Sequence, residues 1–481
     1  MTGETAARSD DSGEGAPHLI RLLGAFDATM IVAGSMIGSG IFIVSADIAR
    51  NVGGAGWLLA VWLLGAFMTV AAAKCYAELA TMFPHAGGQF VFLREAFGPL
   101  AGFLYGWTLF LVIQTGTIAA VAVAFGKFLA VLVPELASAP DVSVLGHPIS
   151  AQQAVAVLVI AGLTAANCAG LRTGKDIQNV FTVAKVASLV ALVLVGVAFG
   201  WNGHVVAQNL ATAWSGPAHG ALLTGFGAAM VGSLFSADAW NNVTFTAAEV
   251  RNPERAVPRA LVLGTVLVVG LYVLANVAYL VVLPVAGDPA GSDVLARGIA
   301  HASQDRVATA VVEQILGPAG ASLMAVLIMI STFGCVNGLI LTGPRLYHAM
   351  AVDGLFVSGL ARLNANSVPA RALVLQGAWA SLLALSGRYG QLLDYVIATA
   401  LLFYALTVIG LLRLRRAQPS GSRQPGAGAS RVAPRSAWLP VTYVILAVLV
   451  CADLLVVKPD YTWPGFLIVA AGLPAYLVWR R

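Results

Sequence analysis

Apolar stretches long enough to cross a lipid bilayer recur along almost the whole chain and leave few folds open to it. A membrane-spanning helix needs about 20 apolar residues, and twelve such segments can be placed in the 481 residues. Hydrophobic residues make up 59% of the chain and charged residues 10%, against roughly 25% charged in soluble domains. We therefore predict an all-α integral membrane protein with twelve transmembrane helices. The predicted spans are 22–49, 55–82, 98–132, 150–170, 174–200, 221–250, 258–284, 317–352, 371–387, 391–414, 437–457 and 462–479.

The basic residues are distributed unevenly between the two sides of these spans. Cytoplasmic loops of membrane proteins are enriched in Lys and Arg. With both termini inside, 19 of the 27 basic residues fall on the cytoplasmic side, among them Arg345, and Lys74, Lys127 and Lys185 fall within spans. The five outer ones are Arg50, Arg297, Arg306, Arg388 and Lys458. We expect a multi-pass protein of the cell inner (plasma) membrane, with cytoplasmic termini and no nucleic-acid partner.

The polar segments divide the chain into five parts: a tail, two five-span halves (22–200 and 221–414), a linker and a final pair of spans. A polar cytoplasmic tail at 1–21 lacks the features of a cleavable signal peptide. A Gly/Ser/Pro-rich cytoplasmic linker at 415–436 separates the first ten spans from helices 11 and 12 at 437–481. The four cysteines lie in apolar runs without metal-ligand spacing, so we expect no metal site, no cofactor and no disulfide.

The first span contains the sequence GSMIGSGIF, with Gly34, Gly38 and Gly40 in an apolar background. One interpretation is close helix packing, since Gly34 and Gly38 form a GxxxG motif. The other is a helix break near Ser39 that exposes backbone groups to a ligand, which is tolerated only where they line a cavity. Taken alone, the motif favours packing.

The sixth span changes this balance because GSLFSADAWNN places several polar residues at membrane depth about 200 residues later. Two interrupted helices, each opening a five-span half (22–200 and 221–414), indicate an inverted-repeat transporter. The N-terminus of a half-helix suits a carboxylate and the C-terminus of its partner suits an ammonium group. An α-amino acid carries both groups on one carbon.

Several motifs in order resemble the amino acid–polyamine–organocation superfamily, and within it the L-type amino acid transporter branch. These motifs are GSMIGSGIF, CYAELATMFPHAGGQFVFLREAFG, AANCAGLRTGKDIQNVFTVAK, WNNVTFTAAEVRNPERAVPRA and FGCVNGLILTGPRL. The resemblance covers nearly the whole ten-span core. It implies a leucine-transporter-type 5+5 inverted repeat with broken helices 1 and 6, and substrate held between these helices and flanked by spans 3, 8 and 10.

The resemblance also implies which residues bind the substrate. The N–H groups of Ser39, Gly40 and Ile41 would hold its carboxylate, and carbonyls near Ile37, Phe235, Ser236 and Asp238 its amino group. Phe235 matches an aromatic gate, and Trp240 and Asn241 match the family's WN. The substrate-binding residues expected are Ile37, Gly38, Ser39, Gly40, Ile41, Phe235, Ser236, Ala237, Asp238, Trp240 and Asn241. Helix packing is the alternative for Phe235 and Trp240.

Lys185 in the fifth span is the most informative single charge. A lysine at the middle of a span costs at least about 2.5 kcal/mol, so it usually faces a partner or a polar cavity. The matching lysine of the family stands in for the second sodium ion of sodium-coupled relatives, which would tether span 1 to span 8 near Gly38 and Cys335. Lys185 could also carry a coupling proton. Lys127, near the outer end of its span, is expected to snorkel to the surface.

Asp238 departs from the family, whose members commonly carry glycine here. Three roles compete: a counter-charge for a cationic substrate, a proton-coupling group, or an N-cap for the second half of span 6. We expect the cap.

Other polar residues in the spans allow weaker interpretations. Ile113, Gln114, Thr117 and Asn337 are candidates for the side-chain pocket, with interhelical hydrogen bonding as the alternative. Glu78, and Glu249 with Arg251 and Arg255, could form ion pairs of a cytoplasmic gate or lie at solvated helix ends.

Together these observations predict a secondary active amino acid transporter, not an enzyme, that works by alternating access. We expect sodium-independent exchange of small or medium neutral L-amino acids, with proton-coupled uptake or a cationic amino acid/polyamine carrier as alternatives. A polytopic membrane enzyme fits less well because the histidines are scattered mostly in loops, and a channel fits less well because two paired helix breaks suit an occluded binding site better than a pore. A Walker A motif is absent, so the sequence does not support ATP hydrolysis. The eukaryotic L-type carriers that this chain resembles bond to a heavy chain through a cysteine in the outer loop between spans 3 and 4. The corresponding loop here, VPELASAPDVSVLGHP, contains no cysteine, so the resemblance implies no disulfide-linked heavy chain, and the expected partners are the lipid bilayer and the substrate.

Overall fold

The computed structural model describes residues 19–144, 147–217, 219–386, 389–417 and 436–479. Most of the predicted N-terminal tail and most of the predicted 415–436 linker therefore lie outside the described residues. Within them the chain is almost entirely helical, and the two strands are the short pair β1 (Val142–Val144) and β2 (His147–Ile149). The predicted all-helical membrane fold is confirmed.

The first half of the chain contains the elements of predicted spans 1 to 5, with short connecting helices. They are α1 (Ala25–Met36), α2 (Gly40–Val52), α3 (Ala55–Met82), α4 (Gln89–Phe97), α5 (Pro99–Thr108), η1 (Leu109–Ile113), α6 (Gln114–Leu132), α7 (Glu135–Ser138), α8 (Ala151–Cys168), α9 (Leu171–Phe199) and α10 (Gly203–Ala211).

The second half contains the elements of the remaining spans. They are α11 (His219–Ser236), η2 (Trp240–Glu249), α12 (Pro253–Val282), α13 (Val294–Arg297), η3 (Ser303–Asp305), α14 (Val307–Leu316), α15 (Pro318–Val352), η4 (Ser358–Ala361), α16 (Ala370–Ser386), α17 (Tyr389–Ala417), α18 (Trp438–Val457) and α19 (Pro459–Trp479).

The number of membrane spans depends on how broken and short helices are treated. In the described part of the chain ten helices are long and apolar enough to cross a membrane, and the bent pair α1 and α2 adds an eleventh. The predicted ninth span is α16, an apolar helix of 17 residues. At 1.5 Å per residue it is about 26 Å long, slightly less than the roughly 30 Å of a bilayer core.

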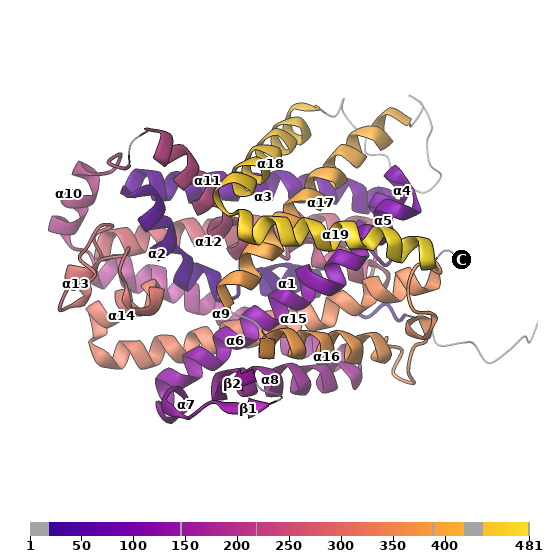
Figure 1. Ribbon diagram of the computed structural model, residues 1–481, viewed down its shortest axis with the longest axis horizontal. Helices are drawn as coiled ribbons and strands as arrows, with labels where there is room; N and C mark the ends of the chain where they lie inside the picture. The colour runs from indigo at the N-terminus through magenta and orange to yellow at the C-terminus, as the bar shows by residue number, and fades with distance from the viewer. Residues whose placement is uncertain (1–18, 145–146, 218, 387–388, 418–435, 480–481) are drawn as a thin grey trace, which may run out of the picture.

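The long helices lie side by side and place the connecting elements at two opposite ends (Figure 1). Helices α10, α13 and α14 gather at one end, which we call the α14 end, and α4 lies at the other, the α4 end. An isolated bridge joins Leu23 before α1 to Val250 after η2. This bridge brings the start of the first span next to the end of the sixth.

The third span is not a uniform α-helix. Between α5 and α6 the five residues of η1 form a π-helical turn. The hydroxyl of Thr115 donates to the carbonyl of Phe110 at 2.6 Å, five residues back, and so occupies an acceptor in the widened turn. π-turns inside α-helices occur frequently at functional sites.

Candidate functional site

The first span breaks where its glycines predict. Helix α1 ends at Met36, α2 begins at Gly40, and the two are bent by 41°. The packing interpretation holds as well: a Cβ at Gly34 would collide with the side chains of Gln178 and Thr182, and one at Gly38 would lie 3.3 Å from the Cys335 sulfur. The motif therefore combines a helix break with close packing, and the binding of a ligand by the exposed backbone groups stays a prediction.

The sixth span also breaks where expected, but its second half is not an α-helix. Helix α11 ends at Ser236, and Ala239 adopts a left-handed conformation with φ of 64° before the 3₁₀-helix η2. Thr244 and Thr246 donate from their hydroxyls to the carbonyls three residues earlier, at 2.7 and 2.9 Å. Such side-chain bonds compete with the α-helical pattern and fit the tighter turn.

The two breaks meet around a small central cavity. A Cβ at Gly40 would lie 2.9 Å from the Ser236 Cα, so only glycine permits this approach. The hydroxyl of Tyr272, on α12, lies 3.1 Å from the carbonyl oxygen of Met36 and 3.0 Å from that of Ser236. The cavity measures about 10 Å³, which is room for about one water molecule. Its walls are Ser35, Met36, Gly38, Ser39, Gly40, Thr117, Val121, Phe235, Ser236, Asp238, Ala239 and Cys335.

The backbone groups at the breaks have the polarity that a zwitterion requires. The N–H groups of Gly40 and Ile41 lie in the first turn of α2, where N–H groups have no acceptor within the helix. The carbonyl oxygen of Ile37 accepts from Lys185 at 2.9 Å and from the Ser331 hydroxyl at 3.2 Å. Because this acceptor already has two donors, an amino group bound there would have to displace one of them.

Lys185 extends from α9 to the break in the first span. Its amino group donates to the carbonyls of Gly34 at 2.5 Å and Ile37 at 2.9 Å, and to that of Ser331 on α15 at 3.3 Å. The Cys335 thiol, also on α15, donates to the Ser35 carbonyl at 3.0 Å. The lysine is fully buried. One ammonium group thus connects the first, fifth and eighth spans.

Asp238 is not the helix cap that we expected. The N-cap of η2 is Ala239, and no side chain caps this helix. Asp238 is 7% exposed, and its carboxylate accepts from the Tyr404 hydroxyl on α17 at 2.7 Å. Asp238 lines the central cavity and also a second cavity of about 20 Å³ toward α3, α17 and α18. The carboxylate therefore stands between two small spaces.

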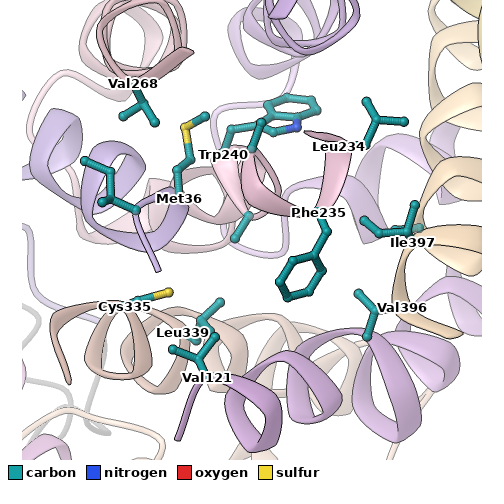
Figure 2. Close-up of a cluster of buried hydrophobic side chains, with 14 of the residues drawn as sticks. Met36, Val121, Leu234, Phe235, Trp240, Val268, Cys335, Leu339, Val396 and Ile397 are labelled. Carbon is teal, nitrogen blue, oxygen red and sulfur yellow. The ribbon is translucent and has the colours of Figure 1, made fainter. Parts of the chain in front are cut away.

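The aromatic residues of the break point to opposite sides (Figure 2). Phe235 points toward the space bordered by Val121, Leu339 and Val396, from α6, α15 and α17. Trp240 packs against the rings of Tyr76 and Tyr404, with centroids 4.7 and 5.4 Å away. Phe235 thus lies on the cavity wall, whereas Trp240 lies in an aromatic cluster behind it.

The remaining residues of the predicted site lie beside the breaks. Ala237 is buried inside the sixth-span break, where its N–H donates to the Ser233 carbonyl at 3.2 Å. The Asn241 amide donates to Gln89 at 2.9 Å, and Gln89 donates to Thr407 at 3.0 Å. Asn241 therefore belongs to a hydrogen-bond chain that connects η2 to α4 and α17.

Of the four side-chain pocket candidates, the structure places Thr117 on the cavity wall. Gln114 donates to the Leu339 carbonyl at 2.8 Å, and Ile113 is buried in the π-turn. Asn337 donates to Gln178 and accepts from Asn167, at 3.0 and 2.9 Å. Gln114 and Asn337 thus follow the alternative interpretation, hydrogen bonding between helices.

The buried ion pair near the α4 end has a partner that we did not expect. Arg345, assigned to the cytoplasmic side from sequence, lies inside α15 and is 1% exposed. Its guanidinium contacts both carboxylate oxygens of Glu249 at 2.9 and 3.2 Å. Among the described residues neither Arg251 nor Arg255 forms an ion pair with Glu249, whereas Glu78 pairs with Arg415 at 2.6 Å. A buried charge needs a partner. The partner of Glu249 is therefore Arg345, where the sequence had suggested Arg251 or Arg255.

Sequence reasoning missed the contributions of Tyr272, Ser331 and Tyr404. Each lies in an apolar run, where a hydroxyl group gives no more than a weak signal. The arginine of FGCVNGLILTGPRL was a stronger signal, because position 345 falls inside the predicted span 317–352 and an arginine at membrane depth requires a partner.

The broken helices, the cavity between them and the lysine beside it define a membrane transport protein of the broken-helix type. Residues 23–471 match the amino acid permease family, and the chain belongs to that family.

Individual members of the family are similar over most of their length. The human large neutral amino acids transporter small subunit 2 is 30% identical over 485 residues, covering 99% of this chain and 84% of that protein. The mouse b(0,+)-type amino acid transporter 1 is 28% identical, covering 86% of this chain and 81% of that protein. The mouse Asc-type amino acid transporter 1 is 29% identical, and the match covers 95% of this chain and 81% of that protein. The resemblance inferred from the motifs is confirmed.

Proposed function

We propose that this protein is a secondary active transporter that exchanges small or medium neutral L-amino acids by alternating access. The observation that carries the proposal is the meeting of the two helix breaks, where Gly40 packs against Ser236 around the central cavity. Free N–H groups of α2 suit a carboxylate, and the carbonyl ends of α1 and α11 suit an ammonium group. The names of the relatives support amino acids as the substrate class.

Transport is proposed to be independent of sodium. Carbonyls of Gly34, Ile37 and Ser331 converge on one point, as ligands of a small hard cation do, and the Lys185 ammonium occupies that point. A fixed positive charge there leaves no electrostatic reason for a sodium ion to bind.

Purified protein in proteoliposomes tests both points. Vesicles loaded with an unlabelled neutral amino acid should take up the labelled form with saturation, at equal rates in sodium and choline buffers. Empty vesicles should take up at least about tenfold less. Uptake that does not saturate contradicts a carrier, and uptake that requires sodium contradicts the proposed role of Lys185.

Proton coupling or a cationic substrate is the second candidate, because the Asp238 carboxylate lines the cavity and does not cap a helix. Asp238→Asn keeps the shape and the acceptor for Tyr404 but removes the charge. An unchanged pH profile and unchanged selectivity for lysine over leucine would eliminate this candidate. Asp453→Asn, on α18 and outside the central cavity, is the matched control.

We also propose that the α4 end faces the cytoplasm of a cell whose inner (plasma) membrane holds the protein, with both termini on that side. The support is the excess of Lys and Arg in the loops assigned to that end. The five-span halves, 22–200 and 221–414, remain the proposed repeat units. The protein is proposed to work without a disulfide-linked partner, which predicts exchange by the chain purified alone.

A further inference from the structure

A larger cavity lies at the α14 end, away from the central site. It measures about 120 Å³, against about 10 Å³ for the central cavity. Its walls come from α6, α13, α14, the segment between α13 and α14, and the start of α15. A cavity of this size can hold the charged end of an organic molecule.

The walls of this outer cavity carry charges of both signs. Arg297, Arg306 and Glu313 all line it. The Arg297 guanidinium donates to the Ser303 hydroxyl, and the Arg306 guanidinium lies over the Phe128 ring, 5.2 Å from its centroid. Among the described residues no ion pair joins Arg297, Arg306 or Glu313 to an opposite charge.

The local structure of α14 gathers these groups on one face. Arg306 immediately precedes α14. Counted from Arg306, the other lining residues of this helix come three, four and seven residues later: Thr309, Ala310 and Glu313. This is the spacing of a single helix face. The Thr309 hydroxyl is buried and has no hydrogen-bond partner among the described residues, and burial without a paired carboxylate lowers the pKa of Arg306. This face of α14 is thus polar and charged, and its Thr309 hydroxyl lacks a hydrogen-bond partner among the described residues.

The outer cavity lies on the same two helices as the central one. Val131 of α6 and Ala321 of α15 line the outer cavity, and Val121 and Cys335 of the same helices line the central one. At 1.5 Å per residue the two sites are about 15 Å apart along α6 and about 21 Å along α15.

We propose that the outer cavity binds a zwitterion, with the two guanidinium groups facing its anionic group and the Glu313 carboxylate facing its ammonium group. Two sources carry this pair of charges: a free amino acid on its way to the central site, and the headgroup of phosphatidylethanolamine. The inference rests on the proposed transport function and on the assignment of the α14 end to the outside.

The test uses Arg306→Gln and Glu313→Gln in right-side-out proteoliposomes made with and without phosphatidylethanolamine. If a free amino acid binds, both variants should raise the external KM about three- to tenfold in both lipid mixtures, with the internal KM unchanged. If the lipid headgroup binds, wild-type exchange should be faster with phosphatidylethanolamine and both variants should lose that difference. Arg306→Lys keeps the charge and should recover most of either effect.

Glu135→Gln, on α7 and outside the cavity, is the matched control and should behave as wild type. Variants that match wild type in both lipid mixtures, while eluting as folded protein, overturn the inference and leave the transport proposal intact. If the wild type exchanges no amino acid, native mass spectrometry still tests whether the outer cavity binds a zwitterion, independently of transport. Wild type should then retain one more leucine or phosphatidylethanolamine molecule than either variant, and equal retention overturns the site.

Discussion

At the scale of single residues, the ammonium group of Lys185 holds backbone atoms of two helices in place. It reaches three carbonyl oxygens, two in the broken first span and one on α15. The lysine arises from α9, so a movement of α1 away from α9 and α15 must break charge-assisted hydrogen bonds. Opening of the first span therefore requires that hydrogen bonds of the Lys185 ammonium group break.

Lys185→Met should lower amino acid exchange at least about tenfold and lower the melting temperature. Methionine keeps the length of the side chain but removes the donor to the Gly34 carbonyl and one of the two donors to the Ile37 carbonyl, and a buried group left unsatisfied costs about 1–3 kcal/mol. Exchange in proteoliposomes and thermal unfolding in detergent measure the two effects. Lys175→Met, in a partly exposed pair on the same helix, is the control. Wild-type exchange in Lys185→Met would contradict this role.

Tyr272→Phe should slow exchange several-fold with little loss of stability. The phenylalanine fills the same space but removes the hydroxyl shared by the carbonyls of Met36 and Ser236, and one such bond contributes about 0.5–1.5 kcal/mol. Tyr279→Phe removes a hydroxyl two turns along α12 that donates to the Ile41 carbonyl alone, and should have the smaller effect. Equal effects of the two substitutions would show that bridging the breaks is unimportant.

At the scale of elements, the two broken spans depend on one close contact. The α2 start and the α11 end touch where Gly40 meets Ser236. Any side chain at position 40 must push the two half-helices apart, and the central cavity lies between them.

Gly40→Ala should abolish measurable exchange while the protein still inserts and purifies. The added Cβ would lie 2.9 Å from a backbone atom, which cannot rotate away as a side chain could. Gly270→Ala in α12 meets nothing within 4 Å and should leave exchange unchanged, since alanine is the better helix former. Normal exchange in Gly40→Ala would mean that the half-helices are farther apart in the working protein.

The sequence was sufficient to locate both breaks, because glycines and polar residues are costly at membrane depth and therefore conspicuous. Lys185 was conspicuous for the same reason. The direction in which a side chain points could not be predicted as well, since almost every face of these helices is apolar. Asn337 was a candidate for the pocket but bonds to α8 and α9, and Arg345 was assigned to the cytoplasmic side although it is buried in α15 and pairs with Glu249.

At the scale of the whole molecule, ion pairs connect separate segments at both ends of the helix bundle. At the α14 end Arg50 of α2 contacts Asp305 at 2.6 Å and the Ala300 carbonyl at 2.8 Å. At the α4 end Arg415 of α17 pairs with Glu78 of α3 at 2.6 Å. Partly exposed pairs contribute only about 0–1 kcal/mol each, which suits contacts that would break and form again in the alternating access proposed above.

Asp305→Asn should favour opening at the α14 end, and Glu78→Gln should favour opening at the α4 end. Cys335 lines the central cavity and can report both changes once Cys75, Cys168 and Cys451 are replaced by alanine. Labelling by a membrane-impermeant maleimide from the α14 side should become about two- to fivefold faster in Asp305→Asn and slower in Glu78→Gln. Changes in the same direction would contradict alternating closure by these pairs.

The π-turn in the third span has a consequence for how insertions and deletions act on this protein. Each residue advances an α-helix by 100°, and the five residues of η1 hold one more residue in the turn than a regular helix would. Residues beyond the turn, including Thr117 and Val121, face the cavity because of that additional residue. The loss of a single codon between positions 109 and 113 would keep the span apolar and helical, yet would turn both side chains away from the cavity and present a different set of residues to the substrate.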